Sequence, residues 1–181
     1  MSKIILETDR LYLRELTQND FNSLCKILQD RDVMYAWEHA FTDEEVQAWL
    51  NNQLRRYNED GFGLWAVVLK DTDEIIGQCG LTIQKINENN NIKNGGVTEV
   101  VEVGYLFQKA YWHNGYATEA ATATKRYAFN NKINRVYSII RDTNIPSQRV
   151  AERNGMQITG EMTKHYNGIT MPHLIYMVED K

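Results

Sequence analysis

A strand, a short loop and a helix that begins at a glycine follow one another without interruption in the chain, and this succession constrains the fold most. Residues 97–107 are rich in β-branched and aromatic side chains and predict the strand. The helix predicted over residues 115–130 has small residues on one face, namely Ala117, Ala120, Ala121, Thr124 and Ala128. Small side chains permit close packing, so we expect this helix to lie directly on a β-sheet.

The start of this helix also predicts an anion site. The first backbone N–H groups of a helix lack intrahelical partners and lie at the positive end of the helix dipole. Gly115 has no side chain, so the segment 112–117 can hold a phosphate or a diphosphate, although many such glycines only serve a turn. The sequence contains neither GxxxxGK[ST] nor GxGxxG, which gives kinases, ATPases and dinucleotide enzymes no support.

The remaining hydrophobic periodicity predicts a mixed sheet. Further strands are expected at residues 11–14, 64–69, 74–83, 136–141, 156–166 and 171–178, and helices after Thr17, after Thr42 and over 146–153. We therefore expect an α/β (mixed α+β) fold, with one domain over residues 1–181, about six to seven strands, and helices on both faces of the sheet. The polar segment 87–96 predicts a solvated hairpin loop, with a functional lid as the alternative.

Composition excludes several classes of protein. The 20 Lys and Arg residues against 24 Asp and Glu residues give a net charge of −4, which weighs against nucleic acid or an anionic membrane as the partner. No apolar run reaches the length of a membrane helix, and the acidic start is unlike a signal peptide. We expect a cytoplasmic protein with reduced Cys25 and Cys79. The four histidines lack metal-ligand spacing, so we expect no metal site.

Three segments together resemble one family. Residues 102–120, from Glu102-Val103-Gly104-Tyr105 to Gly115-Tyr116-Ala117-Thr118-Glu119-Ala120, resemble the coenzyme A-binding segment of the GNAT superfamily of N-acetyltransferases, which reads Q/R-x-x-G-x-G/A. Residues 144–156 resemble its second motif, N-x-x-S followed by a helix and a glycine-methionine pair. Residues 6–14 are similar to the start of the branch that contains ribosomal-protein N-terminal alanine acetyltransferases (RimJ/RimL-like). The three segments occur in the order expected for this superfamily and are spread over nearly the whole chain, so together they resemble it specifically, which no single segment would do.

The resemblance implies a GNAT fold, with a mostly antiparallel twisted sheet whose fourth and fifth predicted strands splay apart to hold acetyl-CoA. The pantetheine arm of this co-substrate would pair with the main chain of Tyr105, Leu106 and Phe107. Its diphosphate would lie on the following loop, which consists of Trp112, His113, Asn114, Gly115, Tyr116, Ala117 and Thr118.

The second motif adds two expected contacts to acetyl-CoA. Asn144 would hydrogen-bond the pantetheine arm, and Ser147 would reach the arm or a phosphate. The alternatives are that Asn144 is a simple capping or turn residue and that Ser147 only satisfies an N–H of the first helical turn. Two positions depart from the family pattern. Trp112 replaces the usual Gln or Arg, and Ala151 stands where many relatives have a tyrosine that protonates the departing thiolate, so no side chain is assigned as general acid.

Acetyl transfer to an amine needs a group that accepts the ammonium proton and a group that stabilises the thioester oxygen. Glu102 is the first candidate base and Glu99 the second, and strand alternation puts them on opposite faces. The alternative is a surface ion pair. A backbone N–H of Leu106 or Phe107 would polarise the carbonyl. Neither cysteine lies beside a histidine in a loop, so we expect direct transfer without a covalent acyl-enzyme.

The acceptor region is expected between the first two helices and near the predicted turn at residues 167–168. Trp37, Glu38 and His39 occupy the segment that contacts acceptors in similar proteins, and His165 and Tyr166 precede the turn, with strand packing as the alternative.

We therefore expect an N-acetyltransferase that acts on a primary amine such as a protein N-terminus, as a monomer or homodimer. A polyamine, an amino acid or an aminoglycoside is an alternative acceptor. A non-catalytic acyl-CoA-binding module is the alternative function. The acidic balance disfavours an RNA-binding domain.

Overall fold

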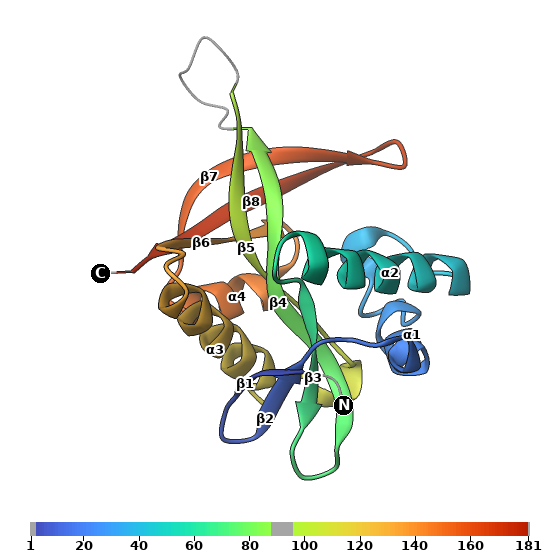
Figure 1. The fold of residues 1–181 in the computed structure, drawn as a ribbon. Coiled ribbons are helices and arrows are strands. Elements are labelled where there is room, and N and C mark those ends of the chain that lie inside the picture. Colours follow the sequence, from blue (N-terminus) through green and yellow to red (C-terminus); the bar gives the residue numbers. More distant parts are fainter. Residues whose placement is uncertain (1–2, 88–95, 181) are drawn as a thin grey trace.

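The structure, a computed structural model, describes residues 3–87 and 96–180, which form one eight-stranded sheet with helices on both faces (Figure 1). The strand order across the sheet is β1-β2-β3-β4-β5-β6-β8-β7. The strands are β1 (Ile4–Glu7), β2 (Leu11–Arg14), β3 (Leu64–Leu69), β4 (Glu74–Asn87), β5 (Val97–Phe107), β6 (Arg135–Arg141), β7 (Gln157–Tyr166) and β8 (Ile169–Glu179). The α-helices are α1 (Phe21–Leu28), α2 (Asp43–Glu59), α3 (Tyr116–Asn130) and α4 (Ile145–Arg153). Short 3₁₀ turns cover Gln18–Asp20, Tyr35–Trp37 and Lys109–Tyr111.

The alternation of side chains along the strands produces two cores, one on each face of the sheet. In β3, Trp65 and Val67 pack with the core that includes Ala120 and Ala121 of α3. The neighbouring Ala66 and Val68 point to the other face and pack with the core formed by α1 and α2. Every residue of β3 is buried, as expected for a central strand covered on both sides. The prediction of helices on both faces is therefore confirmed.

The sheet has eight strands, whereas the sequence predicts six to seven, and the additional strand is β1. β1 contains only four residues and pairs with β2 alone, at the edge of the sheet. Its sequence, Ile4-Ile5-Leu6-Glu7, has three apolar residues in succession and shows no alternation, whereas the equally short β2 alternates and is predicted. Part of the predicted polar loop, residues 88–95, lies outside the described residues, so its interpretation as a solvated loop or a lid stays a prediction.

The pair formed by β5 and β6 is the one parallel pair among the described strands, and it is very short. Its register consists of Glu102 opposite Tyr137, whereas β4 and β5 are paired from Gly77↔Phe107 to Asn87↔Val97. The connection from β5 to β6 runs through α3, as a parallel crossover requires. The predicted separation of two central strands is present here. Among the described helices, none combines the length and apolar character needed to cross a bilayer.

Candidate functional site: an opening between two diverging strands

Two side chains end the pairing of β5 with β6 directly after Glu102. The backbone carbonyl of Val103 accepts a hydrogen bond from Ser138 Oγ at 2.8 Å, and the backbone N–H of Ile139 donates to Glu102 Oε1 at 3.1 Å. In a continuing parallel ladder, that N–H and that carbonyl would bond to each other. Because side chains take both groups, the remaining ends of the two strands are not paired with each other, and we call this break in their pairing the opening.

The register of β4 and β5 decides which backbone groups face this opening. Gln108 N donates to Ile76 O at 2.9 Å, and hydrogen-bonded pairs alternate along an antiparallel ladder. Leu106, two residues earlier, therefore directs its backbone groups toward Gln78 of β4 and away from the opening, so of the two expected donors to a thioester Leu106 is the less suitable. Tyr105 and Phe107 direct theirs toward the opening.

The loop between β5 and α3 presents a row of unpaired backbone donors. Gly115 precedes α3 with φ +79°, and His113 also has a positive φ of +62°. Glu119 N donates to Gly115 O at 3.0 Å, which is the first hydrogen bond of the helix. Among the described residues, no backbone or side-chain acceptor pairs with the N–H groups of residues 113–118. Together with the helix dipole, these donors form a site for an anion, which we call the cradle (residues 113–118).

Trp112 lies at the rim of the cradle as a packing residue. Its indole Nε1 donates to Phe107 O at 3.0 Å, and its ring packs against the cores on both faces of the sheet. The indole therefore holds the loop against the end of β5 and occupies one of the two lone pairs of the Phe107 carbonyl, while the Phe107 N–H stays free for a ligand. This explains how the chain tolerates an aromatic residue in place of a polar one.

The start of helix α4 lies beside β5, to which a hydrogen bond from Tyr105 joins it. Asn144 is its N-cap, with Oδ1 accepting from Ser147 N at 3.2 Å, and this is the capping role given as the alternative for Asn144. The Tyr105 hydroxyl donates to Ser147 O at 2.8 Å, and burial raises its pKa well above the ordinary value. Ala151 is buried in the core one turn later and carries no proton donor.

Of the two predicted bases, only Glu102 lies at the opening. Its carboxylate accepts from Ile139 N and from Thr82 Oγ1 at 3.2 Å. Burial raises its pKa, and Lys164 lowers it only in part. Glu99 is exposed and lies 3.8 Å from Lys85 Nζ, in the surface ion pair that was the alternative for it.

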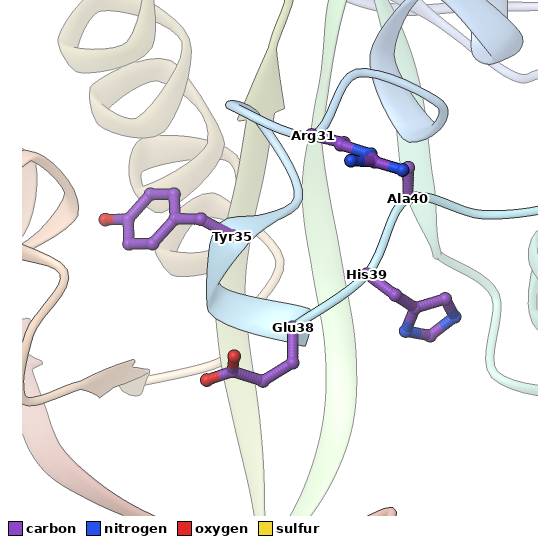
Figure 2. A pocket seen from close by; sticks show the side chains of 5 residues that line it. All are labelled: Arg31, Tyr35, Glu38, His39 and Ala40. Carbon is purple, nitrogen blue, oxygen red and sulfur yellow. The ribbon is translucent and has the colours of Figure 1, made fainter.

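The loop between α1 and α2 reaches the same region and surrounds a surface hollow of about 430 Å³ (Figure 2). Tyr35 projects to one side of this loop and His39 to the other. Glu38 has a positive φ of +66° and forms an ion pair with Arg141, the last residue of β6, whose side chain is 15% exposed. Arg141 Nη1 also lies 3.4 Å from Ala36 O, so the end of β6 anchors the loop beside the opening.

His39 connects this loop with the tip of the β7–β8 hairpin. Its Nε2 lies 2.9 Å from Glu45 Oε1 and its Nδ1 lies 3.2 Å from Trp37 O. Both partners only accept hydrogen bonds, so both are satisfied when the imidazole is protonated. The hydrogen bond to Glu45, followed by that to the Trp37 carbonyl, accordingly raises the pKa of His39. The ring of Tyr166 stacks on His39 with centroids 6.1 Å apart.

The structure thus brings Glu38, His39 and Tyr166 to one place, while Trp37 packs beside them in the core under the loop. His165 is not among them, because it is exposed and its Nδ1 lies 3.4 Å from Thr170 Oγ1. Sequence reasoning missed two arginines. Arg141 ends a diverging strand, and Arg10 belongs to the quoted segment 6–14, so the position of each was a usable signal.

Comparisons with known proteins support one family. The sequence model described as "Acetyltransferase (GNAT) domain" matches residues 10–157. YkkB of Bacillus subtilis (strain 168), an uncharacterized protein, is 36% identical over 167 residues, which cover 90% of this chain and 91% of YkkB. YnaD of the same organism, an uncharacterized N-acetyltransferase, is 30% identical over 161 residues, which cover 88% of this chain and 86% of YnaD.

A solved structure supports the same fold. The apo form of RimL, a ribosomal L7/L12 α-N-protein acetyltransferase, matches with a TM-score of 0.78 at 18% identity. The match covers 99% of this chain and 96% of RimL. At this identity the likeness shows the shared fold.

Proposed function

Since the chain belongs to the GNAT family of acetyltransferases, we propose that it moves an acetyl group from acetyl-CoA directly to a primary amine. The enzyme class, an acetyl-CoA-dependent acetyltransferase, follows from the family. The direct route and the nature of the acceptor are the proposal.

One observation carries the proposal: the unpaired N–H groups of residues 113–118 lie next to the unpaired edge of β5. The first group of donors suits a diphosphate, because backbone N–H groups at a helix start bind anions. The unpaired edge of β5 suits an extended arm with amide groups, because an open strand edge forms hydrogen bonds with such a chain. Coenzyme A has both parts in this order, and its thiol end then lies between the two strands.

In the proposed reaction, the neutral amine nitrogen attacks the thioester carbon, and the C–S bond breaks to release the CoA thiolate. The ammonium form of the amine first loses its proton to Glu102, directly or through one water. The raised pKa of this carboxyl favours its role as a base near neutral pH. The Phe107 N–H, which faces the opening, is the proposed donor to the thioester oxygen. After the attack the nitrogen carries one surplus proton, which passes to solvent as the amide forms. Solvent also supplies the proton that the thiolate takes up.

We place the acceptor in the hollow formed by the loop between α1 and α2, beside Glu38, His39 and Tyr166. Glu38 offers a carboxylate to an ammonium group, and its left-handed backbone conformation is of the kind that clusters at binding sites. A protein N-terminus is the acceptor we propose first, because RimL, which shares the fold, is an α-N-protein acetyltransferase.

The test is release of CoA thiol from acetyl-CoA with a panel of peptides, polyamines, amino acids and aminoglycosides. Mass spectrometry then identifies the acetylated nitrogen. Release that depends on a peptide with a free N-terminus supports the proposal. Release that depends on another amine would identify that amine as the acceptor in its place. Tight binding of acetyl-CoA without turnover on any amine would contradict the proposed activity and support a non-catalytic acyl-CoA-binding module.

A further inference from the structure

The guanidinium of Arg10 contacts three consecutive residues of the cradle. Arg10 Nη1 donates to Asn114 O at 3.0 Å. Its Nη2 lies 3.6 Å from the place that a Cβ would take on Gly115, and its central carbon lies 4.3 Å from the centroid of the Tyr116 ring. A residue from the turn before β2 therefore supports the loop from Asn114 to Tyr116.

Glu119, in the first turn of α3, fixes the position of Arg10. Its Oε2 accepts from Arg10 Nε at 2.7 Å and lies 2.6 Å from Nη2. Its Oε1 accepts from the backbone N–H of Arg10 at 3.1 Å and from Thr8 Oγ1 at 2.6 Å. Burial acts to raise the pKa of Glu119, but the hydrogen bonds from Thr8 and Arg10 outweigh it and lower that pKa. The carboxylate is therefore ionised, and its Oε2 holds the guanidinium through both Nε and Nη2.

This contact determines the direction of a cradle donor. In a trans peptide the C=O and the following N–H point to opposite sides. Because Arg10 binds the Asn114 carbonyl, the Gly115 N–H of the same peptide unit points away from Arg10. Without the guanidinium this exposed glycine unit can rotate, since a glycine has access to both signs of φ.

Arg10 also offsets an unfavourable charge. Glu119 lies one turn from the cradle, with its side chain 19% exposed. An uncompensated carboxylate at this position would repel a diphosphate across a short distance. The arginine therefore orients one donor and neutralises one anion.

We propose that Arg10 is a positioning residue for the diphosphate of coenzyme A, acting through the Asn114–Gly115 peptide and Glu119. The inference rests on the proposed function, because it takes coenzyme A as the ligand of the cradle. It differs from a merely structural role in its consequence: the contribution of Arg10 should depend on whether the ligand has a diphosphate.

The experiment compares CoA with pantetheine, which is the thiol arm without the diphosphate, by calorimetry and by NMR titration. Arg10→Met should weaken CoA binding about tenfold or more, the effect of one charge-assisted hydrogen bond, and leave pantetheine binding within about twofold. Arg135→Met is the matched control, because Arg135 forms an exposed ion pair with Glu179 on strands β6 and β8. This control should leave the binding of both ligands unchanged.

The double variant with Arg10→Met and Glu119→Gln separates orientation from charge. Weaker CoA binding that persists in this variant supports the positioning role, and complete recovery would overturn it in favour of charge alone. Equal losses for CoA and pantetheine, or CoA binding unchanged in Arg10→Met, would also overturn it. Failure of the unaltered chain to bind CoA would instead overturn the proposed function, so the two failures are distinguishable.

Discussion

Gly115→Ala tests the cradle, because the backbone of Gly115 is held in the left-handed region with φ +79°. The added methyl group has room, since the nearest atom outside the adjoining residues is Arg10 Nη2 at 3.6 Å. The cost is therefore conformational, about 1–2 kcal/mol for a residue with a Cβ in this region.

The structure indicates where this cost should appear. His113, Asn114 and Gly115 are exposed, so the loop of the variant can relax in the free protein and must return to the left-handed conformation to bind CoA. When the cost falls on binding, 1–2 kcal/mol corresponds to about 5- to 30-fold weaker CoA affinity. Gly61 is a matched control: it also has φ +79°, it has no neighbouring atom within 4 Å of an added Cβ, and it lies between α2 and β3.

The assay combines calorimetric titration of CoA with chemical unfolding of both variants. Gly61→Ala should lower the free energy of unfolding by about 1–2 kcal/mol and leave CoA affinity unchanged. Gly115→Ala should weaken CoA binding in a folded protein. CoA affinity within twofold of the unaltered chain, or an equal loss in Gly61→Ala, would refute the assignment of this turn to the binding site.

Two carboxylates give further predictions. Glu102→Gln should slow turnover most near neutral pH and least at alkaline pH, where the amine is neutral without a base; a pH–rate profile of unchanged shape and position would contradict the role of Glu102. Glu45→Gln should lower the pKa of His39, measured by NMR titration of its imidazole ring. A raised histidine pKa stabilises the fold below the ordinary value, and this contribution is lost as the pH rises through the raised value, so the variant should lose stability at acidic pH; an equal loss at alkaline pH would count against the pair.

Local patterns were sufficient to predict most elements of the fold. The glycine before small residues predicted the start of α3 at the sheet, and Thr42 predicted the start of α2, where the structure shows a capping box with Thr42 N donating to Glu45 Oε2 at 2.8 Å. These signals lie within one turn of the residues that they describe, so no tertiary information is needed.

The details of the site depend on contacts between residues that lie far apart in the sequence, and local patterns do not predict such contacts. Whether Leu106 or Phe107 faces the opening depends on strand register, and a shift of one residue exchanges them. The stacking of His39 on Tyr166 joins a loop with a distant hairpin, and nothing near either residue predicts the other. The different surroundings of Glu102 and Glu99 likewise arise from neighbouring strands, whereas strand alternation could only separate their faces.

The ion pair between Glu38 and Arg141 joins the loop between α1 and α2 to the end of β6. In the proposed function the loop between α1 and α2 contributes the acceptor side, and β5, α3 and α4 contribute the cofactor side, so each side comes from its own stretch of sequence. Loops tolerate exchange better than the elements that support them. If the acceptor binds where we propose, we expect that a graft of residues 29–42 from another member of the family changes the acceptor, provided that the graft keeps a carboxylate to pair with Arg141.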